Sequence, residues 1–260
     1  MLSDGRRTRL GLGIAGVAAG ILLLPSMYVL GLWLAPPRPV PSDAQVPALL
    51  ADAIWASADG GRAAALQAIN PVNLVDYGVC RILESRAEDP QRQADRRGEC
   101  LRILPALPAT AYLAGVHLRD SQVASTPAWA IQQWATAAWL TRSWTKAELV
   151  ATLAERAEFG FGWRGVDAGA RGYFGTIATT LSVPDAALLA ALIGNGHIDR
   201  WRDPWCDPAT ATTTRGRVLE RMRENLAIDE PAYRRALAAP IELAPAPPEH
   251  RPCTQRTSKQ

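Results

Sequence analysis

The sequence predicts a mainly α-helical domain that follows a single membrane-spanning helix. Leu10 to Ala35 form an apolar run without any charged side chain. Beyond this run, apolar residues recur at helical spacing, and no alternating pattern is long enough to predict a strand. The chain has 260 residues, which is enough for one well-cored domain with an anchor or a tail, and too few for two large domains.

The apolar run has the length that a helix needs to cross a bilayer. Arg6, Arg7 and Arg9 precede it, so the positive-inside rule keeps residues 1–9 in the cytoplasm. A cleavable signal peptide is the alternative, but the run is long for one and lacks a small-residue cleavage site at its end. We therefore expect a transmembrane helix at residues 10–35.

Three further regions follow the predicted span. Residues 36–45 are rich in proline and predict a stiff, extended linker. Residues 46–240 predict the helical domain, and residues 241–260 predict an irregular Pro-rich tail. Within the domain, four segments have helical spacing and recognisable ends: Leu49 to Ile54, Thr145 to Leu153, Ser182 to Ile193 and Thr214 to Leu226. Thr145 with Glu148 has the spacing of a capping box, and Ser182 is placed as an N-cap.

Composition limits the classes of function. Apolar residues make up 48% of the chain and charged residues 20%, which indicates a globular protein. The net charge of +3 is mild and is not concentrated in a basic patch, so nucleic-acid binding is not expected.

Four tryptophans recur every five residues, which spreads them around a helix. They are Trp129, Trp134, Trp139 and Trp144. We interpret them as packing residues, with a sugar-stacking platform as an open alternative.

The chain has four cysteines, Cys80, Cys100, Cys206 and Cys253. None has the CxxC spacing of a zinc site or of a thioredoxin-type pair. Pairing in sequence order, Cys80 with Cys100 and Cys206 with Cys253, suits an oxidising compartment. Four free, buried thiols are the open alternative.

A set of motifs between Thr145 and Met222 resembles a known family. The glycine-rich motif is nearly complete as Gly160, Gly162, Gly165, Val166, Ala168, Ala170, Tyr173 and Phe174, and it is accompanied by Thr145-Lys146, by Leu181-Ser182 with Asp185 to Ala190, and by Arg215, Val218, Leu219 and Met222. On these residues the chain resembles the peptidoglycan glycosyltransferases of family 51. The resemblance is strongest to the monofunctional biosynthetic transglycosylases, which lack a transpeptidase domain.

The resemblance implies a lysozyme-like, mainly α fold over residues 46–240. It also implies a location in the bacterial inner (cytoplasmic) membrane, with the N-terminus in the cytoplasm and the body in the periplasm. Family members polymerise lipid II there. One glutamate is the general base, and basic residues with a second glutamate hold the pyrophosphate leaving group, sometimes with a divalent metal.

The register of the family motifs places the two glutamate positions on Ala58 and Gln133. A methyl group cannot accept a proton, and an amide carries no charge. The two basic residues before the second glutamate fall on Trp129 and Ala130. We therefore expect a degenerate member without an intact catalytic set or metal site, and no cofactor. The candidate substitute carboxylates nearby are Asp59, Glu155 and Glu158.

Other motif positions predict substrate contacts. Lys146 is the only lysine in the body of an arginine-rich chain, and His117 falls at a family lysine position. The glycines suit a tight reversal of the backbone beside a cleft. The predicted substrate-binding residues are Lys146, Gln133, His117, Gly160, Gly162, Gly165 and Tyr173.

Three functions remain open on the sequence. The first is a catalytically impaired protein of cell-wall assembly that binds lipid II, glycan strands or other wall-synthesis proteins. The second is an active glycosyltransferase with relocated carboxylates. The third is a lysozyme-like lytic enzyme, which would need a suitably placed acid that is usually paired with a second carboxylate.

Overall fold

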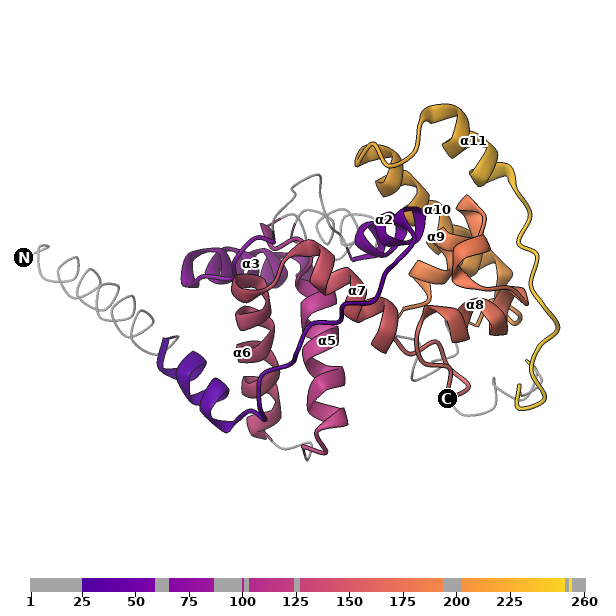
Figure 1. Ribbon diagram of the computed structural model, residues 1–260. Coiled ribbons are helices and arrows are strands. Elements are labelled where there is room, and N and C mark those ends of the chain that lie inside the picture. The colour runs from indigo at the N-terminus through magenta and orange to yellow at the C-terminus, as the bar shows by residue number, and fades with distance from the viewer. Residues whose placement is uncertain are drawn as a thin grey trace, which may run out of the picture. The chain divides into compact units, whose positions relative to one another are not determined.

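The computed structural model describes residues 25–58, 66–86, 100, 103–123, 127–193, 203–250 and 253. Regular structure in these residues is helical, apart from one isolated β-bridge between Glu158 and Arg164. The helices, seen in Figure 1, are α2 (Ala48–Ser57), α3 (Pro71–Ser85), α5 (Leu107–Asp120), α6 (Pro127–Ser143), α7 (Lys146–Arg156), α8 (Val166–Phe174), the 3-10 turn η1 (Ala178–Thr180), α9 (Val183–Ala191), α10 (Pro208–Glu224) and α11 (Glu230–Ala238). The predicted mainly α fold is confirmed.

The predicted membrane span is only partly described. Residues 25–34 are helical, whereas residues 10–24 lie outside the described part of the chain. Among the described residues, no helix combines the length and the apolar character that a membrane crossing requires.

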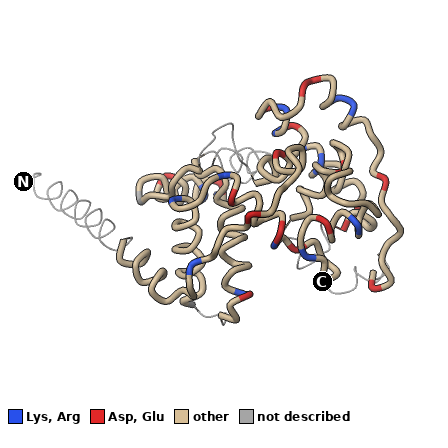
Figure 2. Tube along the Cα trace, in the orientation of Figure 1, with Lys and Arg blue, Asp and Glu red and all other residues tan. Residues whose placement is uncertain are grey.

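The described chain divides into two units. The first contains residues up to Pro39, Ala68–Leu104 and Ala114–Arg142, and the second contains Val40–Gln67, Pro105–Leu113 and Ser143 onward. Helix α5 therefore begins in the second unit and ends in the first. Figure 2 shows both signs of charge along the described chain, with no segment that gathers one sign alone.

In the first unit, residues 25–34 pack closely against α6. A Cβ at Gly31 would lie 2.6 Å from the Cβ of Ala135, so only glycine permits this approach. Gln132 of α6 donates a hydrogen bond from Nε2 to the carbonyl oxygen of Leu34 at 2.7 Å. The Trp134 ring meets Tyr28 edge-on, with centroids 6.1 Å apart. The end of the predicted span is thus held along α6.

The beginning of the Pro-rich linker belongs to the first unit and contacts α5 and α6. His117 Nε2 of α5 lies 2.8 Å from the carbonyl oxygen of Pro37. The Arg38 guanidinium lies 5.6 Å from the centroid of the Trp139 ring on α6. Two of the four regularly spaced tryptophans, Trp134 and Trp139, therefore take part in packing contacts.

The second unit is built around α9. All residues from Ala186 to Ala190 are buried, and α9 packs against both α2 and α10. Ser182 caps α9 by accepting a hydrogen bond from the Asp185 backbone, as the sequence predicted. Thr145 and Glu148 form the predicted capping box of α7.

Helix α10 begins at Pro208, six positions before the predicted start at Thr214. Asp207 is its N-cap and accepts a hydrogen bond from the Thr210 backbone. The intervening threonines favour strands by propensity. Here their hydroxyls donate to carbonyls of the preceding turn, as Thr212 does to Pro208 at 2.8 Å. Tertiary packing of the helix outweighs this local preference.

The described residues 240–250 of the tail are irregular, as predicted, and they lie against the body of the second unit. The Ala244 N–H donates to the Tyr173 carbonyl at 2.8 Å, and Trp205 Nε1 donates to the Ala244 carbonyl at 3.0 Å. The buried Arg215 of α10 donates from Nη2 to the Ala239 carbonyl at 2.8 Å. Helix α11 itself was not identified from the sequence.

Both disulfides join cysteines in sequence order, Cys80 to Cys100 and Cys206 to Cys253. None of the four cysteines is free. The sequential pairing is confirmed, and the alternative of four free thiols is wrong.

We expect Gly172→Ala to destabilise the protein by about 1–3 kcal/mol, because a new methyl group would overpack a filled site. Its Cβ would lie 2.3 Å from the Trp163 ring. Gly78→Ala is the matched control, since a Cβ there meets nothing within 4 Å and alanine favours a helix by up to about 1 kcal/mol. Chemical denaturation measures both changes. Equal stabilities of the two variants would contradict the packing around Trp163.

We expect Thr145→Ala to cost about 1 kcal/mol by removing the N-cap of α7. Hydrogen bonds from the Thr145 backbone and hydroxyl lower the pKa of Glu148. The contribution of Glu148 is therefore present above its unfolded pKa and is lost as the pH falls through the folded value.

Glu148→Ala should accordingly unfold at a lower temperature than the parent at pH 7, and the difference in melting temperature should narrow as the pH falls below about 4. Thermal melts across this range provide the measurement. A gap that is independent of pH would show that the carboxylate does not act through this cap.

Candidate functional site

The predicted site residues are divided between the two units. Ala58, Lys146, Glu155, Glu158 and the glycine motif belong to the second unit, whereas His117 and Gln133 belong to the first. Asp59 lies outside the described residues.

Ala58 closes α2, the helix that packs on α9. Its backbone N–H donates to the Ile54 carbonyl at 3.1 Å, and its side chain is buried. A buried methyl group adds packing but neither accepts a proton nor attracts a cation. At this position the sequence supplies no acid–base chemistry.

Lys146 is the first residue of α7, and its side chain lies against α2. Its Nζ lies 4.0 Å from Asp52 Oδ1 and 5.0 Å from the centroid of the Trp55 ring. The Lys146 side chain is 31% exposed, so the charge remains accessible to solvent. The aromatic face orients the ammonium group, while Asp52 offsets part of the charge that an anionic ligand would meet.

The glycine motif folds into a tight loop between α7 and α8. Gly160, Gly162 and Gly165 have φ of 86°, 77° and 83°, in the left-handed region that favours glycine. Trp163 closes the loop, donating from its backbone N–H to the Gly160 carbonyl at 2.8 Å. A Cβ at Gly165 would lie 3.0 Å from the carbonyl oxygen of Glu155. The predicted need for a tight reversal is confirmed, and the loop explains these glycines without reference to a substrate.

Two of the candidate substitute carboxylates, Glu155 and Glu158, come just before the glycines of this loop. Glu155 is exposed near the end of α7. Glu158 is half-buried, and its backbone N–H donates to the Tyr112 hydroxyl at 3.0 Å. In the described part of the chain, neither belongs to a group of three or more possible metal ligands. Their assignment as catalytic substitutes stays a prediction.

Tyr173 of α8 is buried, with 1% of its surface exposed. Its hydroxyl donates to the Phe159 carbonyl at 2.7 Å. Its ring stacks on Trp205 at 5.0 Å between centroids and meets Trp163 edge-on at 5.2 Å. These contacts give Tyr173 a packing role that the sequence did not predict, and its substrate contact stays a prediction.

Gln133 and His117 lie on facing helices of the first unit. The side-chain Nε2 of Gln133 on α6 would be 3.0 Å from a Cβ at Gly115 on α5, and the Trp129 ring also lies near that point. The missing side chain at Gly115 thus gives the amide room between the two helices. His117, on the same helix as Gly115, is engaged with the Pro37 carbonyl.

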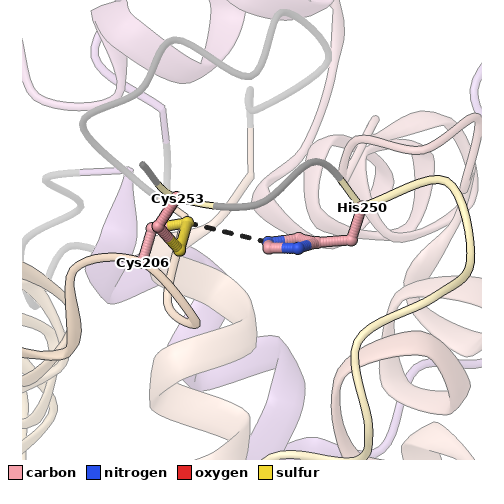
Figure 3. Close-up of side chains that lie close together, drawn as sticks. All are labelled: Cys206, His250 and Cys253. Carbon is pink, nitrogen blue, oxygen red and sulfur yellow. Dashed lines mark hydrogen bonds between the residues drawn. A yellow bond between two sulfur atoms is a disulfide. The ribbon is translucent and has the colours of Figure 1, made fainter. Parts of the chain in front are cut away.

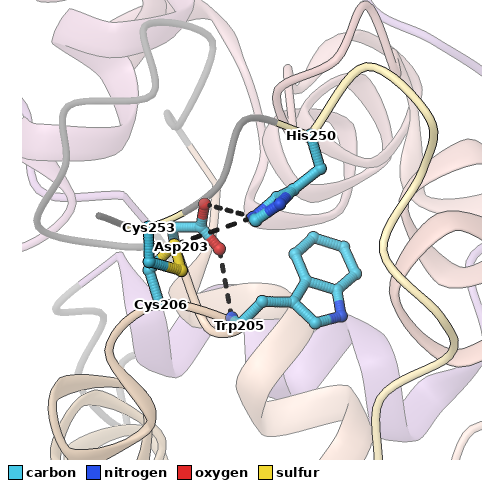
Figure 4. The surroundings of a disulfide bond; sticks show 5 residues. All are labelled: Asp203, Trp205, Cys206, His250 and Cys253. Atoms are coloured by element: carbon cyan, nitrogen blue, oxygen red, sulfur yellow. Dashed lines mark hydrogen bonds and ion pairs between the residues drawn. A yellow bond between two sulfur atoms is a disulfide. The ribbon is translucent and has the colours of Figure 1, made fainter. Parts of the chain in front are cut away.

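One cluster of polar side chains was not predicted from the sequence. In the second unit, His250 Nε2 lies 2.9 Å from Asp203 Oδ2 and 3.8 Å from Cys206 Sγ, next to the Cys206–Cys253 disulfide (Figure 3 and Figure 4). The signal that would have indicated it is a spacing, because Asp203 precedes Cys206 by three positions and His250 precedes Cys253 by three.

Comparison with known families identifies part of the chain. Residues 113–223 match the family model described as Transglycosylase. The match includes Gln133, Lys146 and the glycine motif, and it begins after Ala58. No curated protein matches the chain. The chain therefore carries, over residues 113–223, a domain of the peptidoglycan transglycosylase family, glycosyltransferase family 51.

Proposed function

We propose that this protein is a membrane-anchored, catalytically impaired transglycosylase of bacterial cell-wall assembly. It binds lipid II or glycan strands, or other wall-synthesis proteins, without polymerising glycan. The observation that carries the proposal is Gln133. This residue lies inside the stretch that matches the family, at a position where the resemblance places a glutamate.

The chemistry explains why this change matters. Glycosyl transfer needs a carboxylate within hydrogen-bond reach of the attacking hydroxyl and fixed charge where the leaving group develops negative charge. An amide at Gln133 can orient a substrate but cannot supply charge. The methyl group of Ala58, which the resemblance places at the other glutamate, supports the same conclusion independently.

Other features support binding without turnover. Lys146 presents a partly exposed positive charge beside the Trp55 ring. A lipid-linked pyrophosphate is an anion, so an exposed ammonium group on a fixed helix end is a suitable contact. The proposed ligand class therefore follows from groups that need no catalytic carboxylate.

The proposed location is the bacterial inner membrane, with the body in the periplasm. The uncharged run from Leu10 to Ala35 and the arginines before it support an anchor of this orientation. Two disulfides in one chain support an oxidising compartment. Both arguments favour the side of the membrane where lipid II is used.

Purified full-length protein in detergent should bind lipid II and form no glycan polymer. Lys146→Met should weaken binding about tenfold, the equivalent of one lost charge-assisted hydrogen bond. Lys146→Arg, which keeps the charge, is the matched control. Binding is followed with fluorescent lipid II, and polymer by gel electrophoresis.

Polymer formation that Glu155→Gln or Glu158→Gln abolishes would overturn the proposal in favour of the active enzyme. Release of muropeptides from purified sacculi would point to the lytic alternative. An absence of lipid II affinity, with co-purification of wall-synthesis proteins, would restrict the function to protein interaction.

In cells, the body should resist protease until the outer membrane is opened, and should then be digested in spheroplasts. All four cysteines should react with maleimide only after reduction, because both disulfides form in the proposed compartment. A cytoplasmic protein of the same cells serves as the lysis control. Thiols that react without reduction would contradict the location.

A further inference from the structure

Two short segments of the second unit bring four possible metal ligands to one place. Asp203 and Cys206 lie in the turn before α10, and His250 and Cys253 lie in the tail (Figure 4). Each segment has two residues between its ligands, as Asp-Pro-Trp-Cys and as His-Arg-Pro-Cys. Paired ligands with this spacing are typical of structural zinc sites. The CxxC pattern does not describe them, because each pair has only one cysteine.

Three of the four ligand atoms already lie close together. The ligand atoms of Cys206, His250 and Cys253 all lie within 4.8 Å of one another (Figure 3). Around a zinc ion, ligand atoms of this kind are about 3.3–3.8 Å apart, given the usual metal–ligand lengths. His250 Nε2 already lies 3.8 Å from Cys206 Sγ. Asp203 Oδ2 lies 2.9 Å from the same nitrogen but outside the group of three, so its carboxylate must shift towards the sulfur atoms to become the fourth ligand.

The surroundings hold two of the ligands in place. The side chains of Asp203 and His250 are 1% and 9% exposed. Asp203 Oδ1 accepts a hydrogen bond from the Trp205 backbone at 3.0 Å, which leaves Oδ2 directed at His250. The rings of Trp205 and Phe161 flank the imidazole, with centroids at 5.3 Å and 5.8 Å. Oriented ligands in an apolar surround are what a metal site requires.

The two sulfur atoms cannot bind an ion in this state, because they are bonded to each other in the disulfide. Cys253 is exposed, so a reductant or an ion has a path to the cluster. Opening the bond changes two inert sulfurs into two thiols beside an imidazole and a carboxylate.

We propose that Asp203, Cys206, His250 and Cys253 bind a zinc ion when the Cys206–Cys253 disulfide is reduced. A dithiol reductant breaks the S–S bond and becomes a disulfide itself, and two protein thiols form. Zinc then displaces one proton from each thiol. The resulting set of two thiolates, one imidazole and one carboxylate suits zinc by ligand type and number.

The consequence is that the tail is attached to the body in either redox state. The disulfide closes a separation of 47 residues, and the zinc ion would close the same loop through the same side chains. This site requires neither glycan binding nor a membrane, so its test is independent of the proposed function.

The test uses full-length protein in detergent, either oxidised or reduced with a dithiol that is then removed under anaerobic conditions. Each sample is incubated with zinc chloride, desalted and analysed for metal content. We expect one zinc ion per reduced chain and none per oxidised chain. Cobalt(II) in place of zinc should give the visible spectrum of a tetrahedral thiolate site.

His250→Gln and Asp203→Asn should each weaken zinc binding at least tenfold, because loss even of an outer-shell partner costs about 10–100-fold. The amide oxygen that Asp203→Asn introduces can still accept the Trp205 N–H. The control removes the other disulfide by Cys80→Ser with Cys100→Ser. Neither of these cysteines belongs to a group of three possible ligands among the described residues, so the control should bind zinc as the parent does.

The variants are first compared in the oxidised form, where the disulfide holds the tail and circular dichroism reports the fold. If reduction loosens the tail, zinc should restore the near-ultraviolet signal of the aromatic cluster. A fully reduced chain that binds no zinc would overturn the proposal. Zinc binding that is unchanged in both His250→Gln and Asp203→Asn would overturn it as well.

Discussion

From Ala186 to Ala190, helix α9 is apolar and buried, and the second unit depends on this burial. A helix of this kind is stable only when other elements cover its whole circumference. Helices α2 and α10 pack against it, and the small side chains of Ala186, Ala187 and Ala190 allow close contact. The position of α2 in turn sets Ala58 at its end and brings Asp52 and Trp55 beside Lys146. The surroundings of Ala58 and Lys146 therefore follow from packing around one alanine-rich helix.

A second constraint is the aromatic cluster of Trp163, Tyr173 and Trp205. These rings join the glycine loop, α8 and the turn before α10, and the tail is hydrogen-bonded to the same residues through Ala244. Gly172 is part of this arrangement, since any side chain there would enter the Trp163 ring.

This cluster offers a physical reason for the uneven match to the family motifs. The glycines of the loop are required by backbone angles and ring packing, so the fold needs them whether or not the protein has an activity. A carboxylate at position 58 or 133 has no comparable structural task. A charge at the buried position 58 would also carry a desolvation cost. The proposed loss of the acidic groups, with retention of the glycines, is then the pattern expected of a scaffold that is kept for binding.

The sequence by itself determined the features that depend on neighbouring residues. These features are the helix caps at Thr145 and Ser182, the glycines with positive φ, and the mainly helical fold. All of them follow from interactions within a few positions of the chain. The sequential pairing of the cysteines was one of several open possibilities, because four cysteines allow three connectivities or can all stay free. Tertiary structure decided the features that depend on distant contacts. It extended α10 through a run of threonines, buried Tyr173, engaged His117 with the Pro37 carbonyl, and brought Asp203 to His250 across 47 positions. Local sequence patterns cannot predict these long-range contacts, because such contacts depend on how whole helices pack.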